Sequence, residues 1–324
     1  MPRCHHTIAA CLLLMVLFPQ ASQAYWIVDG VPVCTAFEEQ HFPAIASDSS
    51  GGAIIAWQDY RSGGPSIYVQ RLDANGEPVW TANGVAICTN TGISPQVVSD
   101  GSGGVIVTWQ DNRSGEYDIY AQRIDKNGNL LWGSDGVAVC SATGGQYDPM
   151  IATDGQGGAI ITWEDRRTGT SDIYAQRLSA GGDAIWTTNG VPICTASGAQ
   201  GYVAMIPNGS GGAIITWQDE RSGTSDVYVQ MIDRDGNCMW TADGVAICTA
   251  PNLQCNIALT SDGSGGAIIV WSDYRSGTYD GNIYAQRVSS GGSVLWTSNG
   301  VGICTRSGTQ LEPVITSDGS GGAI

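Results

Sequence analysis

Five copies of a Trp-x-Asp-x-Arg motif carry paired charges that could do chemistry. The copies are Trp57-Asp59-Arg61, Trp109-Asp111-Arg113, Trp163-Asp165-Arg167, Trp217-Asp219-Arg221 and Trp271-Asp273-Arg275. A catalytic site needs its special residues once, whereas a repeat architecture needs its structural residues once per unit. Asp and Arg two residues apart at the end of a strand lie on one face of it. We therefore expect each pair to order a partly exposed turn and to tie that turn to the next unit.

A second repeated segment, which leads into the first strand of each unit, carries amides, acids and aromatic rings. Gln recurs in it at one register, as Gln40, Gln146, Gln200, Gln254 and Gln310. The unit-specific neighbours are Glu39, His41, Phe42, Tyr147, Asp148, Tyr202, Asn256 and Glu312. Such side chains are suited to weak recognition of a polar ligand such as a sugar. The alternative is that each Gln only hydrogen-bonds the backbone of the neighbouring unit.

The elements that must position these residues form one unit that is repeated along the chain. The pattern Trp-x-x-Asn/Asp-Gly-Val-x-x-Cys ends at Cys34, Cys88, Cys140, Cys194, Cys248 and Cys304, so 270 residues over five steps give a mean period of 54. Turn residues divide each period into four extended segments, which in the second unit are residues 95–100, 104–111, 118–125 and 130–140. Helical periodicity is absent. The sequence predicts an all-β fold, a β-propeller of four-stranded blades, against a β-helix or a string of sandwiches.

The two ends of the sequence are offset from the repeat. "YWIVDGVPVC" near the N-terminus is a last-strand sequence without preceding strands, and "SDGSGGAI" at the C-terminus stops where earlier copies continue to Trp. We expect residues 25–324 to form the propeller, with five full repeat periods plus partial terminal units. The offset predicts six blades, the last one incomplete in this chain, with the N-terminal strand completing the final blade.

The repeat resembles that of two families of secreted bacterial propellers. "SDGSGGAIITWQDER" followed by "SDVYVQMIDRDG" is similar to the TolB-type repeat, and also to the repeats of sialidase-like propellers. This resemblance implies a propeller fold. A sialidase-type mechanism would need three converging arginines and a Tyr paired with an acid. Nine of the 13 basic residues after residue 24 belong to repeated columns, which leaves Lys126, Arg166, Arg234 and Arg306, so the sequence offers no identifiable catalytic set.

Composition narrows the class of protein further. Residues 1–24 are typical of a secretory signal peptide, which predicts a secreted protein in an extracellular or periplasmic setting. The whole chain has a net charge of −16, and loss of Arg3 with the signal leaves 13 basic and 30 acidic residues, or −17. This charge disfavours nucleic acid as a partner, and no later segment is apolar enough to insert in a membrane. His41 is the only histidine after residue 24, which argues against zinc sites and histidine-based catalysis. We expect neither a metal nor a cofactor.

The repeated cysteines belong to different blades and are expected to be buried free thiols. Cys238 and Cys255 stand outside the repeated column. They are the candidate disulfide, with a bond between Cys238 and Cys248 as the alternative.

These observations predict a non-catalytic binding module for a carbohydrate or for a surface or extracellular protein. The alternatives are an enzyme like the glycoside hydrolases, of the sialidase kind, and a purely structural repeat of a larger surface protein. The Asp-Arg turns and the Gln segments should emerge on one face of the propeller. The Gln segments would then ring the mouth of the central channel.

Overall fold

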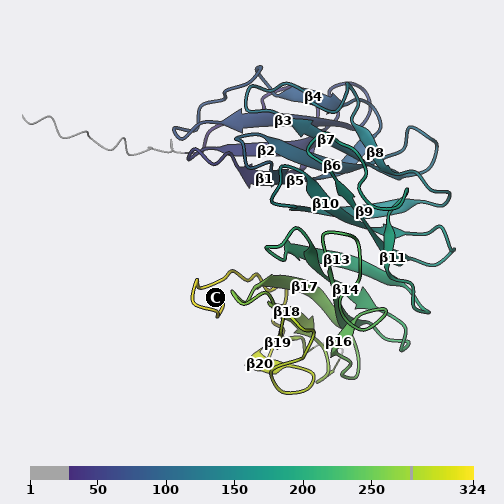
Figure 1. Cartoon of the computed structure of the whole chain (residues 1–324). Coiled ribbons are helices and arrows are strands. Elements are labelled where there is room, and N and C mark those ends of the chain that lie inside the picture. The colour runs from purple at the N-terminus through teal and green to yellow at the C-terminus, as the bar shows by residue number, and fades with distance from the viewer. Residues whose placement is uncertain (1–28, 278–279) are drawn as a thin grey trace, which may run out of the picture.

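The computed structural model describes residues 29–277 and 280–324, and all regular structure in these ranges is β (Figure 1). Twenty strands form five four-stranded antiparallel sheets, each made of four consecutive strands. Blade 1 holds β1 (Gln40–Ser47), β2 (Ala53–Asp59), β3 (Ser66–Leu72) and β4 (Val85–Cys88); blade 2 holds β5 (Gly92–Ser99), β6 (Val105–Asp111), β7 (Asp118–Ile124) and β8 (Val137–Cys140); blade 3 holds β9 (Gln146–Thr153), β10 (Ala159–Asp165), β11 (Asp172–Leu178) and β12 (Val191–Cys194); blade 4 holds β13 (Gln200–Pro207), β14 (Ala213–Asp219), β15 (Asp226–Ile232) and β16 (Val245–Cys248); blade 5 holds β17 (Gln254–Ser261), β18 (Ala267–Asp273), β19 (Asn282–Val288) and β20 (Val301–Cys304).

The blades follow one another in an arc, with their first strands innermost (Figure 1). β1, β5, β9 and β13 each contact the first strand of the next blade. The second strands are runs of Ile, Val and Trp, and every residue of β6, β10, β14 and β18 is buried. Strands buried on both faces carry apolar residues continuously rather than alternately. The structure therefore confirms the predicted propeller of four-stranded blades.

Two features of the strands differ from the expectation. The first strand begins earlier and contains a bulge, at which Phe42, Ser94, Asp148, Tyr202, Asn256 and Glu312 have φ between 48° and 55°. The last strand is only four residues long, because the segment before it is held by a side chain instead of a ladder. In blade 2 the Gln122 amide accepts from the backbone N–H of Trp132 at 2.8 Å and donates to the Gly133 carbonyl at 2.7 Å.

Each interface between blades is closed by both columns of tryptophans. Trp109, Trp163, Trp217 and Trp271 are completely buried in the apolar clusters that join neighbouring blades. In the second column, the indole N–H of Trp80 donates to the Lys126 carbonyl of blade 2 at 3.1 Å, and Arg71 donates to the same oxygen at 3.0 Å. A single carbonyl thus fixes two side chains of the preceding blade.

The Asp-Arg turns are paired as predicted, but their carboxylates are more deeply buried than expected. Both oxygens of Asp165 accept hydrogen bonds from the Arg167 guanidinium, at 2.8 and 2.6 Å, and Trp163 donates its indole N–H at 2.8 Å. Cys140 of the preceding blade lies 3.8 Å from the same carboxylate. The Arg167 guanidinium also lies over the Tyr174 ring at 4.0 Å. Asp165 has no exposed surface, so the expectation of a partly exposed turn is wrong for the acid.

The candidate disulfides are not formed. All eight cysteines of the described residues are free, and Cys88, Cys140, Cys194 and Cys248 are buried as expected. Cys238 precedes the outermost strand of blade 4 and is exposed, whereas Cys255 lies on the innermost strand of blade 5. Cys248 lies at the other end of β16, next to Asp273 at 3.6 Å. Cys238 is therefore separated from Cys248 by the length of β16, and from Cys255 by its place on the innermost strand of another blade.

The segment before blade 1 packs as the end of a blade would. Cys34 contacts Asp59, and the Thr35 backbone N–H donates to Asn83 at 2.8 Å, as that of Ser141 donates to Asn189 at 3.1 Å. After blade 5, residues 316–324 begin a hairpin with a bridge between Ser317 and Ala323. The predicted signal peptide and Tyr25–Val28 lie outside the described residues. No described helix is long and apolar enough to cross a membrane.

Candidate functional site

The Asp-Arg turns and the segments that join the blades lie on the same face, as the sequence predicts. The backbone N–H of Asn112, in the turn after β6, donates to the Thr91 carbonyl in the segment before β5, at 3.1 Å. The N–H of Gln146 donates to the Tyr117 carbonyl of blade 2 at 2.7 Å. The two kinds of loop are therefore bonded to each other on this face of the arc.

The repeated glutamines are mostly buried beneath this face. Gln146, Gln200 and Gln254 have almost no exposed surface. The Nε2 atom of Gln200 donates to the carbonyls of Ala196 and Gly198 in its own loop, at 3.2 and 3.1 Å. Gln40 and Gln310, at the two ends of the arc, are half-buried. The column thus holds the joining loops from inside, and its bonds go to its own loop rather than to the neighbouring blade.

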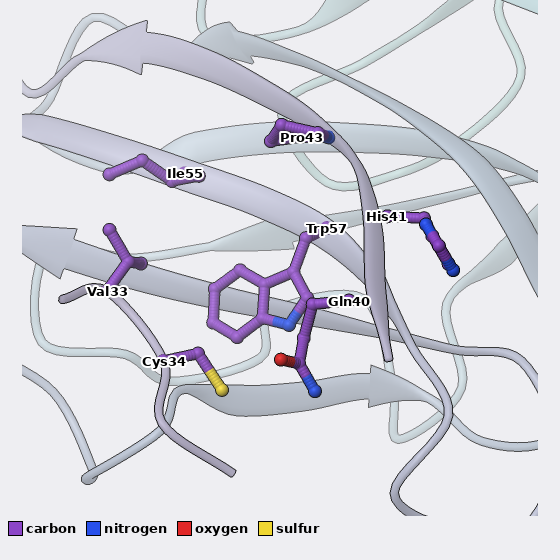
Figure 2. Close-up of a pocket in the computed structure, with 7 residues that line it drawn as sticks. All are labelled: Val33, Cys34, Gln40, His41, Pro43, Ile55 and Trp57. Atoms are coloured by element: carbon purple, nitrogen blue, oxygen red, sulfur yellow. The ribbon is translucent and has the colours of Figure 1, made fainter. Parts of the chain in front are cut away.

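The other predicted residues lie at separate interfaces. His41 pairs with Glu39 at 2.9 Å and packs edge-on against Tyr60 in blade 1. Figure 2 shows His41 and Gln40 at the rim of a mainly apolar pocket over Trp57. This pocket lies on the face of blade 1 that, in the later blades, is packed against the blade before.

Two further predicted residues, Asn256 and Glu312, meet at blade 5. The Asn256 amide and the Glu312 backbone N–H both lie within hydrogen-bond distance of the Ser272 hydroxyl, at 3.5 and 3.1 Å. They are the bulge residues of consecutive units. They lie at a different interface from Asp148 and Tyr202.

Asp148 and Tyr202, by contrast, come together at a polar cavity between blades 3 and 4. The cavity has a volume of about 260 Å³. Its lining comprises Asp148, Glu164, Arg166, Ser171, Ala199, Gln200, Gly201, Tyr202, Gln218 and Glu220. Tyr202 is 73% exposed, although it is one of the largest side chains on this face. It also lines a second cavity of about 220 Å³ toward the channel, together with Asp148 and Met150.

One residue of the lining, Gly201, is an exception to the repeat. The second residue of the first strand is His41, Ile93, Tyr147, Gly201, Cys255 and Leu311 in successive units. Only Gly201 has no side chain at this position, and a Cβ added to it would lie 2.5 Å from Oε1 of Glu164. The Glu164 side chain therefore occupies the space that a side chain at this position takes in the other units, and Gly201 and Glu164 both line the cavity.

The acid at the base of this space is also an exception to the repeat. The residue after the buried Trp is Gln58, Gln110, Glu164, Gln218 and Ser272 in the five blades. Glu164 is 8% exposed and accepts hydrogen bonds from the Tyr202 backbone N–H at 2.7 Å and the Ser171 hydroxyl at 3.2 Å. Burial raises the pKa of Glu164, and the bond from Tyr202 opposes this shift. Gln58 accepts from the Ser94 N–H at 3.3 Å in the same way, so Glu164 adds charge to a conserved geometry of the repeat.

One cation accompanies these acids. The Arg166 guanidinium lies 4.6 Å from the centre of the Tyr147 ring, which in turn packs against Tyr117 of blade 2. Tyr147 therefore supports Arg166 instead of lining the cavity. On the opposite rim the residue in the place of Arg166 is Glu220. The lining thus holds three carboxylates and one guanidinium.

The sequence predicts three of the lining residues, Asp148, Gln200 and Tyr202. It does not predict the others, among them Glu164, Gly201 and Glu220, or Arg166, which stands outside the repeated columns. The signal for Glu164 and Gly201 was their departure from the residue that other units carry at the same position. The motif "WEDRR" matches the other copies at Trp, Asp and Arg, so its Glu differs from the Gln of "WQDYR" and "WQDNR" only in a comparison of the units position by position.

The fold and this cavity define a β-propeller protein with a polar pocket between two of its blades. No family model matches the chain, and no curated protein matches it. Among solved structures it is similar to a protein described as TolB from Agrobacterium tumefaciens, with 16% identity over 81% of this chain and 82% of that one, and a TM-score of 0.42.

Two similar structures were solved with arabinobiose. One is the α-L-arabinofuranosidase of Fusarium graminearum, with 14% identity, coverage of 86% and 84% of the two chains and a TM-score of 0.47. The other is the α-L-arabinanase of Penicillium chrysogenum, with 13% identity, coverage of 90% and 88% and a TM-score of 0.46. At these identities and TM-scores, no activity or ligand is transferred to this chain.

Proposed function

We propose that this chain is a secreted, extracellular or periplasmic β-propeller that binds carbohydrate in the cavity between blades 3 and 4. The observation that carries the proposal is the polar cavity that Gly201 and the buried Glu164 line, beside the exposed ring of Tyr202. Sugar sites combine an aromatic surface with a few placed hydrogen-bonding groups. Here Tyr202 offers the ring, while Asp148, Glu164 and Glu220 offer acceptors.

The test is a glycan array probed with the purified protein and with a variant in which the cavity is closed. Glu164→Gln combined with Gly201→Ile gives blade 3 the Gln and blade 4 the Ile that blades 1 and 2 carry at these positions. Because the structure shows how Gln58 and Ile93 fit, this variant is expected to fold. Glycan binding by the protein and its loss in the folded variant would support the proposal. An array without binding, or binding that survives the double change, would contradict it.

A second candidate function is hydrolysis of a glycosidic bond, which one observation favours. Burial raises the pKa of Glu164, as is needed for a general acid, and Asp148 lines the same cavity. Glycoside hydrolysis uses a protonated and an ionised carboxyl on opposite sides of the scissile bond. Incubation of array-positive oligosaccharides with the protein, followed by product analysis, tests this candidate. Cleavage by the protein and none by Glu164→Gln would support it, whereas binding without cleavage would leave the non-catalytic module.

A further inference from the structure

We infer that the cavity between blades 3 and 4 selects a glycan that carries a free amine, such as a glucosamine oligomer, over acetylated and carboxylated sugars. This inference rests on the proposed carbohydrate binding and names the class of sugar. It follows from the charge of the lining, which holds three carboxylates and one guanidinium, and from one buried acceptor of the lining that has no donor among the described residues.

The carboxylates of the lining outnumber its cations. Asp148, Glu164 and Glu220 lie around the cavity, and Arg166 is the single cation among the lining residues. The Arg166 guanidinium already lies over the ring of Tyr147. An anionic sugar would therefore meet repulsion, and the net charge of −16 on the whole chain adds to it.

A buried acceptor in the lining points to a donor in the ligand, independently of the acids. Gln200 is 1% exposed and lines the cavity, and its Oε1 atom has no hydrogen-bond partner among the described residues. Its Nε2 atom is already used by two loop carbonyls, so the amide cannot be turned without losing those bonds. The Oε1 atoms of Gln146 and Gln254 also have no hydrogen-bond partner among the described residues, but neither residue lines this cavity. A buried acceptor without a partner lowers stability unless a donor reaches it.

An ammonium group matches these requirements. It offers three N–H donors and no acceptor, and its charge offsets that of Glu164, which burial disfavours. Acetylation removes the charge and adds an acceptor oxygen. A sugar carboxylate supplies acceptors only. The lining thus favours the amine over both derivatives.

The position of the amine is set by the interface between the two blades. Glu164 enters from β10, whereas Gln200 and Gly201 lie on β13. Gly201 pairs with Gln218 of β14, and both line the cavity together with Glu164, so the cavity lies between the two sheets. A ligand there contacts both blades at once.

Titration calorimetry with three hexasaccharides tests the inference: β-1,4-linked glucosamine, its N-acetylated form and a galacturonic acid hexamer. We expect the glucosamine hexamer to bind about tenfold or more tightly than the other two, and its affinity to fall as salt is raised. The Glu164→Gln variant should lose about tenfold or more in affinity for the glucosamine hexamer. Glu77→Gln is the matched control, since it removes the same charge from an exposed turn that bears no cavity residue, and it should leave the affinity unchanged.

The outcomes distinguish failure of the amine selection from failure of the proposed carbohydrate binding. If the N-acetylated hexamer or a neutral array glycan binds as tightly as the amine, the amine selection is wrong while carbohydrate binding stands. If no sugar binds, both are wrong. Selective amine binding that Glu77→Gln weakens as much as Glu164→Gln would reflect the charge of the whole chain, and would overturn the assignment to this cavity.

Discussion

Asp165 shows how one residue of the repeat joins three neighbours in the interior. It accepts hydrogen bonds from Trp163 and Arg167 and is contacted by Cys140 of the preceding blade. A buried carboxylate with this many donors is costly to remove, since the donors lose their partner while staying buried. The sequence predicts the pair but not its burial, because the thiol that covers the acid comes from a residue 25 positions earlier.

The first prediction compares substitutions at the two ends of this hydrogen bond. Trp163→Ala removes a fully buried indole and should lower the free energy of unfolding by about 3 to 5 kcal/mol. Asp165→Ala should lower it by a similar amount, about 3 to 5 kcal/mol, because a buried pair loses one partner. Urea denaturation of both variants measures the two values. A loss of about 1 kcal/mol for Asp165→Ala, the value typical of an exposed pair, would show that the acid is not buried in solution.

The second prediction concerns the stability of the protein at low pH. Burial by itself raises the pKa of Asp111, but hydrogen bonds from Arg113 and Trp109 outweigh it and lower the pKa to about 2. The folded pKa lies below the ordinary value of 3.8, so this carboxylate stabilises the protein above about pH 4 and ceases to do so as the pH falls toward 2. The pKa values of Asp59 and Asp273 are lowered in the same way. Free energies of unfolding measured from pH 6 to pH 2 should decline steeply below pH 4, and a flat profile would contradict the role of these acids.

The pKa of Glu164 is shifted in the opposite direction, which gives the third prediction. Burial raises its pKa, so its contribution to stability is fully present below the unfolded pKa and is lost as the pH rises through the raised folded pKa. Glu164→Gln should therefore raise the melting temperature at pH 7, and the gain should shrink at pH 4, where the acid is protonated. Thermal unfolding at the two pH values measures the difference. A variant that is less stable than the parent at pH 7 would show that the ionised acid is needed for folding.

At the scale of elements, the blades are joined by side chains that reach a turn of the next blade. Arg177 pairs with Asp154 at 2.9 Å and donates to the Arg234 carbonyl of blade 4 at 3.1 Å. Blade 4 departs from this rule, with Met231 in place of the Arg and Asn208 in place of the Asp. Asn208 keeps the turn, since its Oδ1 atom still accepts from Ser210 and Gly212. Both charges are thus replaced together.

The fourth prediction uses this natural exchange as a double-mutant cycle. Asn208→Asp alone should lower the free energy of unfolding by about 1 to 3 kcal/mol, because the new carboxylate lacks its partner. Adding Met231→Arg should restore the loss, with a coupling energy of about 1 to 3 kcal/mol between the two positions. Chemical denaturation of the two single variants and the double variant gives the coupling. Additive effects would contradict the pairing of these columns.

The limits of sequence reasoning are also clearest at this scale. The strand order, the period and the face that carries the loops follow from local patterns of apolar and turn residues, and the structure confirms them. The bulge in the first strand was not foreseen, because Asp148 and Tyr202 take positive φ without being Gly or Asn. The late start of the last strand, at Val137 in blade 2, has a related cause. Gln122 replaces ladder bonds with side-chain bonds, and a strand pattern does not reveal that exchange.

At the scale of the whole molecule, near-identical units produce one interface that differs from the rest. The repeat sets equal positions around the channel mouth, and the unit-specific residues decide what each interface can hold. Glu164 and Gly201 belong to different units, 37 positions apart in the sequence (201 − 164). Their proximity follows only once the blades are placed side by side. Inspection of either repeat alone could therefore not reveal the cavity.

The two ends of the arc also show features of an interface between blades. Cys34 and Thr35 make the contacts that the last strand of a blade makes with the next one. Val314 and Ile324 beyond blade 5, and Ile45 in blade 1, expose large apolar side chains. The arrangement agrees with an N-terminal segment that belongs to the end of a blade. Closure of the ring by this segment remains a prediction.

The central claim is that the interface between blades 3 and 4 is the ligand site, and backbone amide hydrogen exchange with and without a bound sugar tests it most directly. The protein should be measured with the tightest sugar from the array at saturation. We expect slower exchange in residues 147–148, 164–171 and 199–203, including the Tyr202 amide that Glu164 holds, and unchanged exchange at the equivalent segments of the other blades. Protection at those other segments, with none between blades 3 and 4, would contradict the claim.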